Sequence, residues 1–183
     1  VGGDRLDVDL DVASGSRTLV TTQAAEKVYR STGLECFLSV DIHASEASWV
    51  EWLPHETIIF DGARIRRRVS LNVDGGARVL AGDLLVFGRR AHGESLSYGL
   101  VHDEWQVRVD SRLSWADTLR LDGDLATQQM APAGLDGSNA MATLLYVAPD
   151  AERWLQPALK LIGQEDLRSG ASCVGGLLIV RWL

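Results

Sequence analysis

The sequence predicts a mostly β fold built from antiparallel strands in a single domain. Three observations support this prediction: apolar and polar residues alternate along several segments, turn residues separate those segments, and helical periodicity is confined to the last third of the chain. Alternation with a period of two is typical of strands that bury one face. With 183 residues, the chain is long enough to bury a substantial hydrophobic core.

The alternating pattern is clearest in four segments. In RLDVDLDV at residues 5–12, leucine and valine point to one side of the predicted strand and aspartate to the other. Residues 36–43, 69–73 and 105–110 repeat this pattern. The turn signals are Ser14-Gly15, Asp61-Gly62, Asp74-Gly75-Gly76, Gly82-Asp83, His92-Gly93 and Asp122-Gly123. Short strands between such turns predict an antiparallel architecture. The sequence contains no internal repeat of fixed period.

Two helices are predicted toward the C-terminus. PDAE at residues 149–152 is a helix start signal, and apolar residues follow it at helical spacing as far as Ile162. Pro157 is expected to kink or divide this helix, and Gly163 is expected to end it. A second, short helix is predicted around residues 137–144.

The composition argues against several classes of protein. The 25 acidic and 18 basic residues give a net charge of −7, whereas a nucleic-acid binder normally carries a basic face. No apolar run approaches the ~20 residues that a membrane-spanning helix needs. Cys36 and Cys173 lie outside any zinc-ligand spacing. We interpret them as free, buried thiols in a reducing compartment, which predicts a cytoplasmic location, with a disulfide as the alternative.

The two ends of the chain indicate a longer protein. The sequence begins at Val1 rather than at a methionine, the first predicted strand starts at Arg5, and the last apolar run ends at Leu183. We therefore expect residues 1–183 to form a single domain that is truncated at both ends.

EWLPHETIIFDGAR, at residues 51–64, contains the densest group of unusual residues. One interpretation is a hairpin in which Asp61 caps its own turn and Glu56 faces water. The other interpretation brings His55, Glu56 and Asp61 together as ligands of a divalent cation such as nickel or zinc. No fixed ligand spacing decides between the two, so both stay open.

GRRAHGE, at residues 88–94, also allows two interpretations. His92 and Glu94 are two residues apart and would share one face of a strand, and the two glycines would let another segment approach closely. The alternative is a solvated loop.

The basic residues Arg64, Arg66, Arg67 and Arg68 form one cluster. We interpret this cluster as a solvated strand face that pairs with acidic side chains. The alternative is a docking site for an acidic partner.

The common enzyme motifs are missing from the sequence. It has no GxSxG, no HExxH, no P-loop and no GxGxxG after a strand. Their absence weakens the enzyme hypothesis without eliminating it. A carbohydrate-active β-fold enzyme that works through two carboxylates therefore stays as one alternative function.

Four segments follow one another in a characteristic order. They are VGGDRLDVDLDV at residues 1–12, TTQAAEKVYRSTG at 21–33, EWLPHETIIFDGAR at 51–64 and GRRAHGE at 88–94. In residue identity, order and spacing, these segments resemble the UreD family of urease accessory proteins, called UreH in some bacteria. The resemblance covers essentially the whole chain, more loosely in the last third. His55 departs from it, because the LPxET motif of the family usually carries Gln at this position.

This resemblance implies a chaperone without catalytic activity. It implies a mostly β fold of stacked, helically arranged strands with a pair of helices, and direct binding to apo-urease. It further implies recruitment of UreF and of UreG, a GTPase that carries nickel. Ni(II) would pass transiently through an internal, water-filled passage into urease, and no cofactor would be tightly bound. Nucleic acids and membranes are not expected partners.

The resemblance also selects candidate residues for the nickel passage. The carboxylates are Asp4, Glu56, Asp61 and Glu94, and the histidines behind them are His55 and His92. Weak, dispersed oxygen ligands suit conduction, because a tight cage would hold the ion. Tyr29 and Arg30 are expected to pack and to dock partners. An alternative function is a pure interaction scaffold that opens urease while nickel takes another route. Because unpaired strand edges invite association, we expect the protein to need a partner for solubility.

Overall fold

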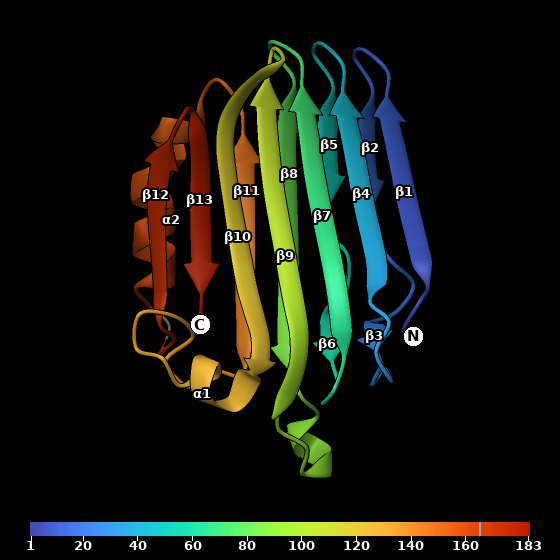
Figure 1. Ribbon diagram of the computed structural model, residues 1–183. Coiled ribbons are helices and arrows are strands. Elements are labelled where there is room, and N and C mark those ends of the chain that lie inside the picture. The colour runs from blue at the N-terminus through green and yellow to red at the C-terminus, as the bar shows by residue number, and fades with distance from the viewer. Residues whose placement is uncertain (165) are drawn as a thin grey trace.

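The computed structural model of the protein describes residues 1–164 and 166–183 and consists mainly of two β-sheets that pack face to face (Figure 1). The front sheet contains, in spatial order, β1 (Arg5–Val12), β4 (Cys36–Ala44), β7 (Arg64–Val73), β9 (Tyr98–Val109) and β10 (Arg112–Asp124). The back sheet contains, in spatial order, β12 (Ser169–Val174), β13 (Leu177–Trp182), β11 (Ala140–Val147), β8 (Arg78–Phe87), β5 (Trp49–Trp52) and β2 (Arg17–Val20). Two further short strands, β6 (Thr57–Ile59) and β3 (Glu26–Val28), pair with each other, and β6 also pairs with β8.

The first half of the chain winds as a solenoid. It passes from β1 to β2 and β3, then from β4 to β5 and β6, and then from β7 to β8, crossing between the sheets each time. Each strand therefore lies beside the strand one coil earlier and runs in the same direction. The pairs β1–β4, β4–β7 and β7–β9 are all parallel. The predicted mostly β fold and its stacked arrangement of strands are thus confirmed.

The prediction of antiparallel strands is wrong for this solenoid. Among the named strands, antiparallel pairing occurs in the later part of the fold, in β9–β10 and in the series β8–β11–β13–β12. The physical reason is that a Gly-rich turn shows that the chain reverses direction but does not determine which of the two sheets the next strand joins. Within one sheet a reversal makes a hairpin, whereas between two sheets it makes a coil with parallel neighbours.

The register of the front sheet explains how the core forms. Val8, Val40, Val69 and Trp105 occupy one cross-strand row, and their side chains face the back sheet. One core cluster contains this row, and a second lies nearer the opposite ends of the strands, around Ile65. The number of residues in each coil of the solenoid varies. One cross-strand row contains Arg5, Phe37, Arg66 and His102, and these residues are unequally spaced in the sequence. This is why the sequence shows no fixed period.

The C-terminal helix matches its prediction. A 3₁₀ turn η2 (Ala151–Trp154) leads into α2 (Leu155–Ile162), and Gly163 is the C-cap. The division of the helix expected at Pro157 is wrong: this residue lies in the first turn of α2, where no intrahelical bond needs its missing N–H, so the helix continues through it. No helix among the described residues is long and apolar enough to cross a membrane.

The second predicted helix lies elsewhere in the chain. The helix expected at residues 137–144 is wrong, because β11 covers most of that range. The other α-helix is α1 (Leu125–Gln129), which Asp124 caps through a hydrogen bond from the N–H of Thr127. Its five residues are too few to show helical periodicity in the sequence.

Gly82-Asp83 was predicted as a turn but lies inside β8. A Cβ atom at Gly82 would approach the side chain of Leu53 to 3.1 Å, so this glycine allows close packing between neighbouring segments. Asp83 points into the space between the sheets. Cys36 and Cys173 are both free and half-buried, which agrees with the prediction of free thiols and excludes the disulfide.

Candidate functional site

The turns that follow β3, β6 and β8 meet at the lower end of the solenoid in Figure 1. They bring together residues of three of the four motif segments. The N–H of Gly62 donates to the carbonyl of Tyr98 at 2.8 Å, and Arg30 bridges to Ala63. We call this cluster the motif pole. It consists of Tyr29, Arg30, Phe60, Asp61, Arg89 and Glu94.

Asp61 ties one coil to the next at the motif pole. One carboxylate oxygen accepts hydrogen bonds from the N–H and the hydroxyl of Ser97, both at 2.7 Å, and from the N–H of Tyr98 at 3.2 Å. The other oxygen accepts from Arg30 at 2.9 Å. Partial burial opposes ionisation, but these hydrogen bonds outweigh it and hold the pKa of Asp61 below its usual range. Asp61 therefore does much more than cap its own turn.

A stack of side chains lies next to Asp61. The ring of Tyr29 meets the ring of Phe60 edge-on at 4.8 Å, and the guanidinium of Arg89 lies 4.0 Å from the centre of the Phe60 ring. Arg89 also donates to both carboxylate oxygens of Glu94, at 2.6 and 3.2 Å. The hydrogen bonds from Arg89 lower the pKa of Glu94. The pole is thus a fixed arrangement of aromatic rings and arginine–carboxylate pairs.

Of the two glycines of GRRAHGE, Gly88 lets another segment approach closely, as predicted, whereas no other segment that the structure describes lies near Gly93. Gly88 has a φ of +80°, and a Cβ atom there would lie 2.8 Å from the carbonyl oxygen of Glu94. The turn is a 3₁₀ helix, η1 (Arg90–His92), followed by Gly93 in the left-handed conformation. His92 is exposed on this turn and does not share a strand face with Glu94. The loop interpretation of this segment is therefore the correct one.

The structure brings only some of the candidate nickel ligands together. Asp61 and Glu94 are close enough for the charge of Asp61 to oppose the ionisation of Glu94. Asp4 is exposed and lies before β1, outside the motif pole. His55 is exposed and Glu56 is half-buried in the segment between β5 and β6. Among the described residues, no group of three or more His, Cys, Asp or Glu side chains is arranged to hold a metal ion.

Sequence reasoning missed a buried group of charges between the sheets. Arg67 donates to Asp103 at 2.7 Å, to Asp83 at 2.9 Å and to the hydroxyl of Thr57 at 3.4 Å. The side chains of Arg67, Asp103 and Asp83 are only 5%, 6% and 7% exposed. Burial alone would lower the pKa of Arg67, but the two carboxylates outweigh it and raise this pKa. We call these four residues the buried arginine cluster.

The interpretation of Arg67 as part of a solvated strand face is therefore wrong. Along β7, Ile65, Arg67 and Val69 face the interior, while Arg66 and Arg68 face outward. The signal was present in the sequence, because the alternation of Val69, Leu71 and Val73 places Arg67 on the same face. The prediction placed the four arginines on one surface because they are close in sequence. Successive side chains of a strand point to opposite faces of the sheet, so these arginines belong to two different faces.

A narrow cavity of about 70 Å³ borders the buried arginine cluster. Arg67, Asp83 and Thr57 line it together with His55 and Glu26, and its other lining residues are largely apolar. His55 therefore has access to a space that reaches a buried carboxylate. Because Asp83 is already paired with Arg67, this carboxylate is not an open ligand in the cavity.

Comparison with known proteins agrees with the four sequence motifs. A family model described as UreD urease accessory protein matches residues 1–183. Proteins named urease accessory protein UreD from Magnetococcus marinus and Xanthobacter autotrophicus are 45% and 42% identical to this chain. These matches cover 100% and 99% of this chain and 65% and 63% of the two relatives. The chain thus spans a little under two thirds of their length.

Proposed function

Because this chain belongs to the UreD family of urease accessory proteins, we propose that it acts in urease maturation as an assembly factor and not as an enzyme. The protein binds apo-urease and, together with UreF and UreG, supports the insertion of nickel. The observation that carries this proposal is the family match over residues 1–183. Three of the family motifs meet at the motif pole, which offers partners an ordered surface.

The composition of the motif pole supports a role in binding proteins. Tyrosine and arginine are enriched where protein interfaces gain most of their affinity. Tyr29 and Arg30 are largely exposed, and Arg30 keeps free hydrogen-bond donors although it pairs with Asp61. The ring of Phe60 holds Tyr29 and hydrogen bonds to Asp61 hold Arg30, so a partner would lose little entropy on binding these two side chains.

The alternative of a carbohydrate-active enzyme fits the buried carboxylates poorly. Asp83 and Asp103 are both buried between the sheets and share the partner Arg67. A glycosidase needs two carboxyl groups that flank a bound sugar. Asp83 and Asp103 both pair with Arg67 and are almost completely buried, so a sugar could not reach them.

For nickel, we propose brief contacts along a path rather than a resident site. The candidates are Asp4, Glu56, Asp61, Glu94, His55 and His92. Weakly held carboxylates can exchange an arginine partner for a passing cation, whereas a closed cage would retain the ion. The cavity beside His55 supports this route, although Asp83 would have to leave Arg67 to contact the metal. The alternative is a scaffold without a nickel path, in which the same residues stabilise the fold and never contact nickel.

Co-purification tests the assembly role. Full-length protein with Tyr29→Ala or Arg30→Ala, co-expressed with apo-urease, UreF and UreG, is expected to co-purify less of at least one partner than the wild type. Arg112→Ala, which changes an exposed arginine on β10 away from the pole, serves as the control. If both pole variants retain all three partners at wild-type levels, the pole is not the binding surface.

Single carboxylate replacements test the nickel path. Glu56→Gln and Glu94→Gln keep the shape of each side chain and remove its charge, and Glu46→Gln in the exposed turn after β4 is the matched control. A path predicts normal assembly with a lower nickel content of urease for Glu56→Gln or Glu94→Gln. Normal assembly together with full nickel content would favour the scaffold without a path.

A further inference from the structure

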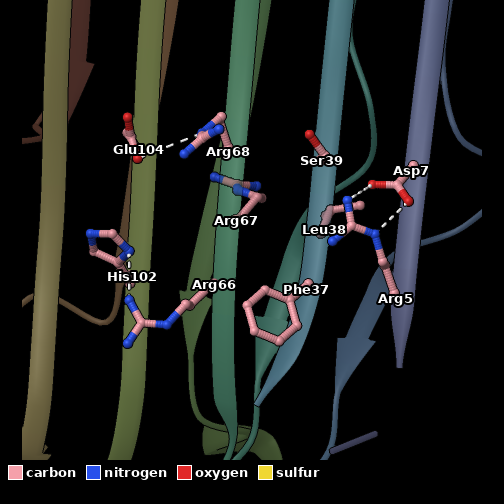
Figure 2. A pocket seen from close by; sticks show the side chains of 10 residues that line it. All are labelled: Arg5, Asp7, Phe37, Leu38, Ser39, Arg66, Arg67, Arg68, His102 and Glu104. Atoms are coloured by element: carbon pink, nitrogen blue, oxygen red, sulfur yellow. Dashed lines mark hydrogen bonds and ion pairs between the residues drawn. The ribbon is translucent and has the colours of Figure 1, made fainter. Parts of the chain in front are cut away.

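A hollow on the outer face of the front sheet is not explained by the motif pole or the buried arginine cluster. Its volume is about 260 Å³, and Figure 2 shows the side chains around it. Eight of the ten labelled side chains form two cross-strand rows on neighbouring strands, and Leu38 and Arg67 belong to the row between them. One row is Arg5, Phe37, Arg66 and His102, and the other is Asp7, Ser39, Arg68 and Glu104. We call this feature the outer-face hollow.

The hollow exists because of one small residue. Ser39 lies between Asp7 and Arg68 in its row, and its neighbours have longer side chains. Ser39 also turns away from the hollow to donate a hydrogen bond to Asp41 at 2.9 Å. Next to this gap, the ring of Phe37 is 44% exposed among charged side chains. An apolar ring framed by arginines is typical of protein interfaces.

Two arginines of the hollow are held in place before any partner arrives. Arg66 pairs with Glu35 and donates to Nδ1 of His102 at 3.3 Å. Arg5 donates to both carboxylate oxygens of Asp7, at 2.7 and 2.9 Å. Such pairing fixes the direction of each guanidinium and lowers the entropy that binding would cost.

Arg68 is the least engaged cation of the hollow. Its side chain is 59% exposed, and its contact with Glu104 is long, at 3.7 Å. A guanidinium has five donor N–H groups and binds carboxylates in a planar, bidentate manner. Arg68 can therefore accept a further carboxylate without breaking a strong bond.

Aspartates gather farther along β1 and β4 on the same sheet face. The next row beyond the hollow is Asp9, Asp41, Ser70 and Gln106, and the row after it is Asp11, His43, Asn72 and Arg108. The aspartates of these two rows thus lie on β1 and β4, beyond the arginines of the hollow. A segment lying along the strands would match this face with acidic residues at one end and a basic residue at the other.

We propose that the outer-face hollow docks an acidic segment of a protein partner in the urease assembly complex. The segment places a carboxylate on Arg68 and an apolar side chain against Phe37, above Ser39. This inference rests on the proposed assembly function and adds a binding site, distinct from the motif pole, together with the chemistry of its ligand.

Two variants test the charge and the shape of the hollow separately. Arg68→Glu reverses the charge that the carboxylate needs, while Ser39→Trp fills the gap without changing any charge. Arg112→Glu makes the same charge reversal on an exposed residue of β10 outside the hollow. Binding of the full-length proteins to purified apo-urease, UreF and UreG is measured one partner at a time.

The proposal predicts that Arg68→Glu and Ser39→Trp each weaken binding of the same partner by about tenfold or more. Arg112→Glu leaves this affinity within about twofold, and Arg68→Lys retains most of it. Because the contact is ionic, raising the salt from about 50 to about 300 mM weakens the wild type more than Arg68→Glu. Unchanged affinity of Arg68→Glu and Ser39→Trp for all three partners overturns the proposal.

A synthetic peptide with alternating glutamate and phenylalanine residues tests the hollow without any urease protein. Wild-type protein is expected to bind this peptide, and Arg68→Glu is expected to lose the binding. Equal binding by both overturns the proposal while leaving the assembly function intact. A second copy of this chain is the other possible occupant of the hollow, and analytical ultracentrifugation tests for it. If the wild type forms a dimer that Arg68→Glu dissociates, the hollow binds a second copy, which contradicts the proposal of an acidic partner.

Discussion

The buried arginine cluster and the motif pole use the same chemistry in opposite surroundings. In the cluster, Arg67 holds Asp83 and Asp103 between the sheets with almost no exposure. At the pole, Arg30 is 71% exposed while its partner Asp61 is 16% exposed. Burial makes an ion pair costly to break, whereas exposure lets water or a partner replace one side of it. We infer that the cluster maintains the two-sheet frame, and that at the pole a partner can reach the exposed Arg30 while Asp61 stays bound.

The largest expected effect is the loss of Arg67. Arg67→Met leaves Asp83 and Asp103 buried without a counter-charge, which we expect to lower the free energy of unfolding by about 3–5 kcal/mol. Urea denaturation of the purified protein measures this change. Replacing all three residues with apolar ones of similar size is expected to restore much of the stability. A loss below about 1 kcal/mol for Arg67→Met would remove the distinction between the two regions.

Asp61→Ala is expected to have a smaller effect. The change removes the acceptor of four hydrogen bonds at the pole, and we expect it to lower the free energy of unfolding by about 1–3 kcal/mol. It should also speed hydrogen exchange at the amides of Ser97 and Tyr98, which lose their acceptor. Unchanged exchange at both amides would show that Asp61 does not join the coils.

The dependence of stability on pH tests whether the pole carboxylates are stabilised in their ionised form. The pKa values of Asp61 and Glu94 are lower in the folded protein than in the unfolded chain. Their contribution is therefore complete above the unfolded value of about 4 and is lost as the pH falls through the folded values. Urea midpoints between about pH 3 and pH 7 should fall more steeply for the wild type than for Asp61→Asn. Parallel curves would contradict this assignment.

The smallest expected effect is that of Glu94→Gln. Its partner Arg89 stays in contact with the ring of Phe60, and the amide can still accept a hydrogen bond. We expect the free energy of unfolding to change by less than about 1 kcal/mol, as for other exposed ion pairs. A loss as large as that of Arg67→Met would place Glu94 in the structural frame.

The sequence predicted the strands of the front sheet much better than the way they connect. Alternation identified segments that lie in β1, β4, β7 and β9, since a half-buried strand needs an apolar residue at every second position. It could not show that the chain crosses to the back sheet after each of the first three strands. Gly-rich turns serve hairpins and coils equally, and only the packing of whole strands decides between them.

Residues of the candidate site were partly predictable for the same reason. The interior position of Arg67 follows from alternation along its own strand, but its partners Asp83 and Asp103 come from other strands. Asp61 was recognisable as a turn residue, whereas its bonds to Ser97 and Tyr98 depend on how one coil stacks on the next. The outer-face hollow depends on the register that places Ser39 beside Arg68, which no local pattern contains.

The central claim, a role in urease maturation, is tested most directly by the nickel content of urease. Urease would be purified from cells that make its subunits, UreF and UreG, with or without the full-length form of this protein. The account predicts nickel-filled, active urease when the protein is present and largely nickel-free urease when it is missing. Equal nickel content in both preparations would contradict the account.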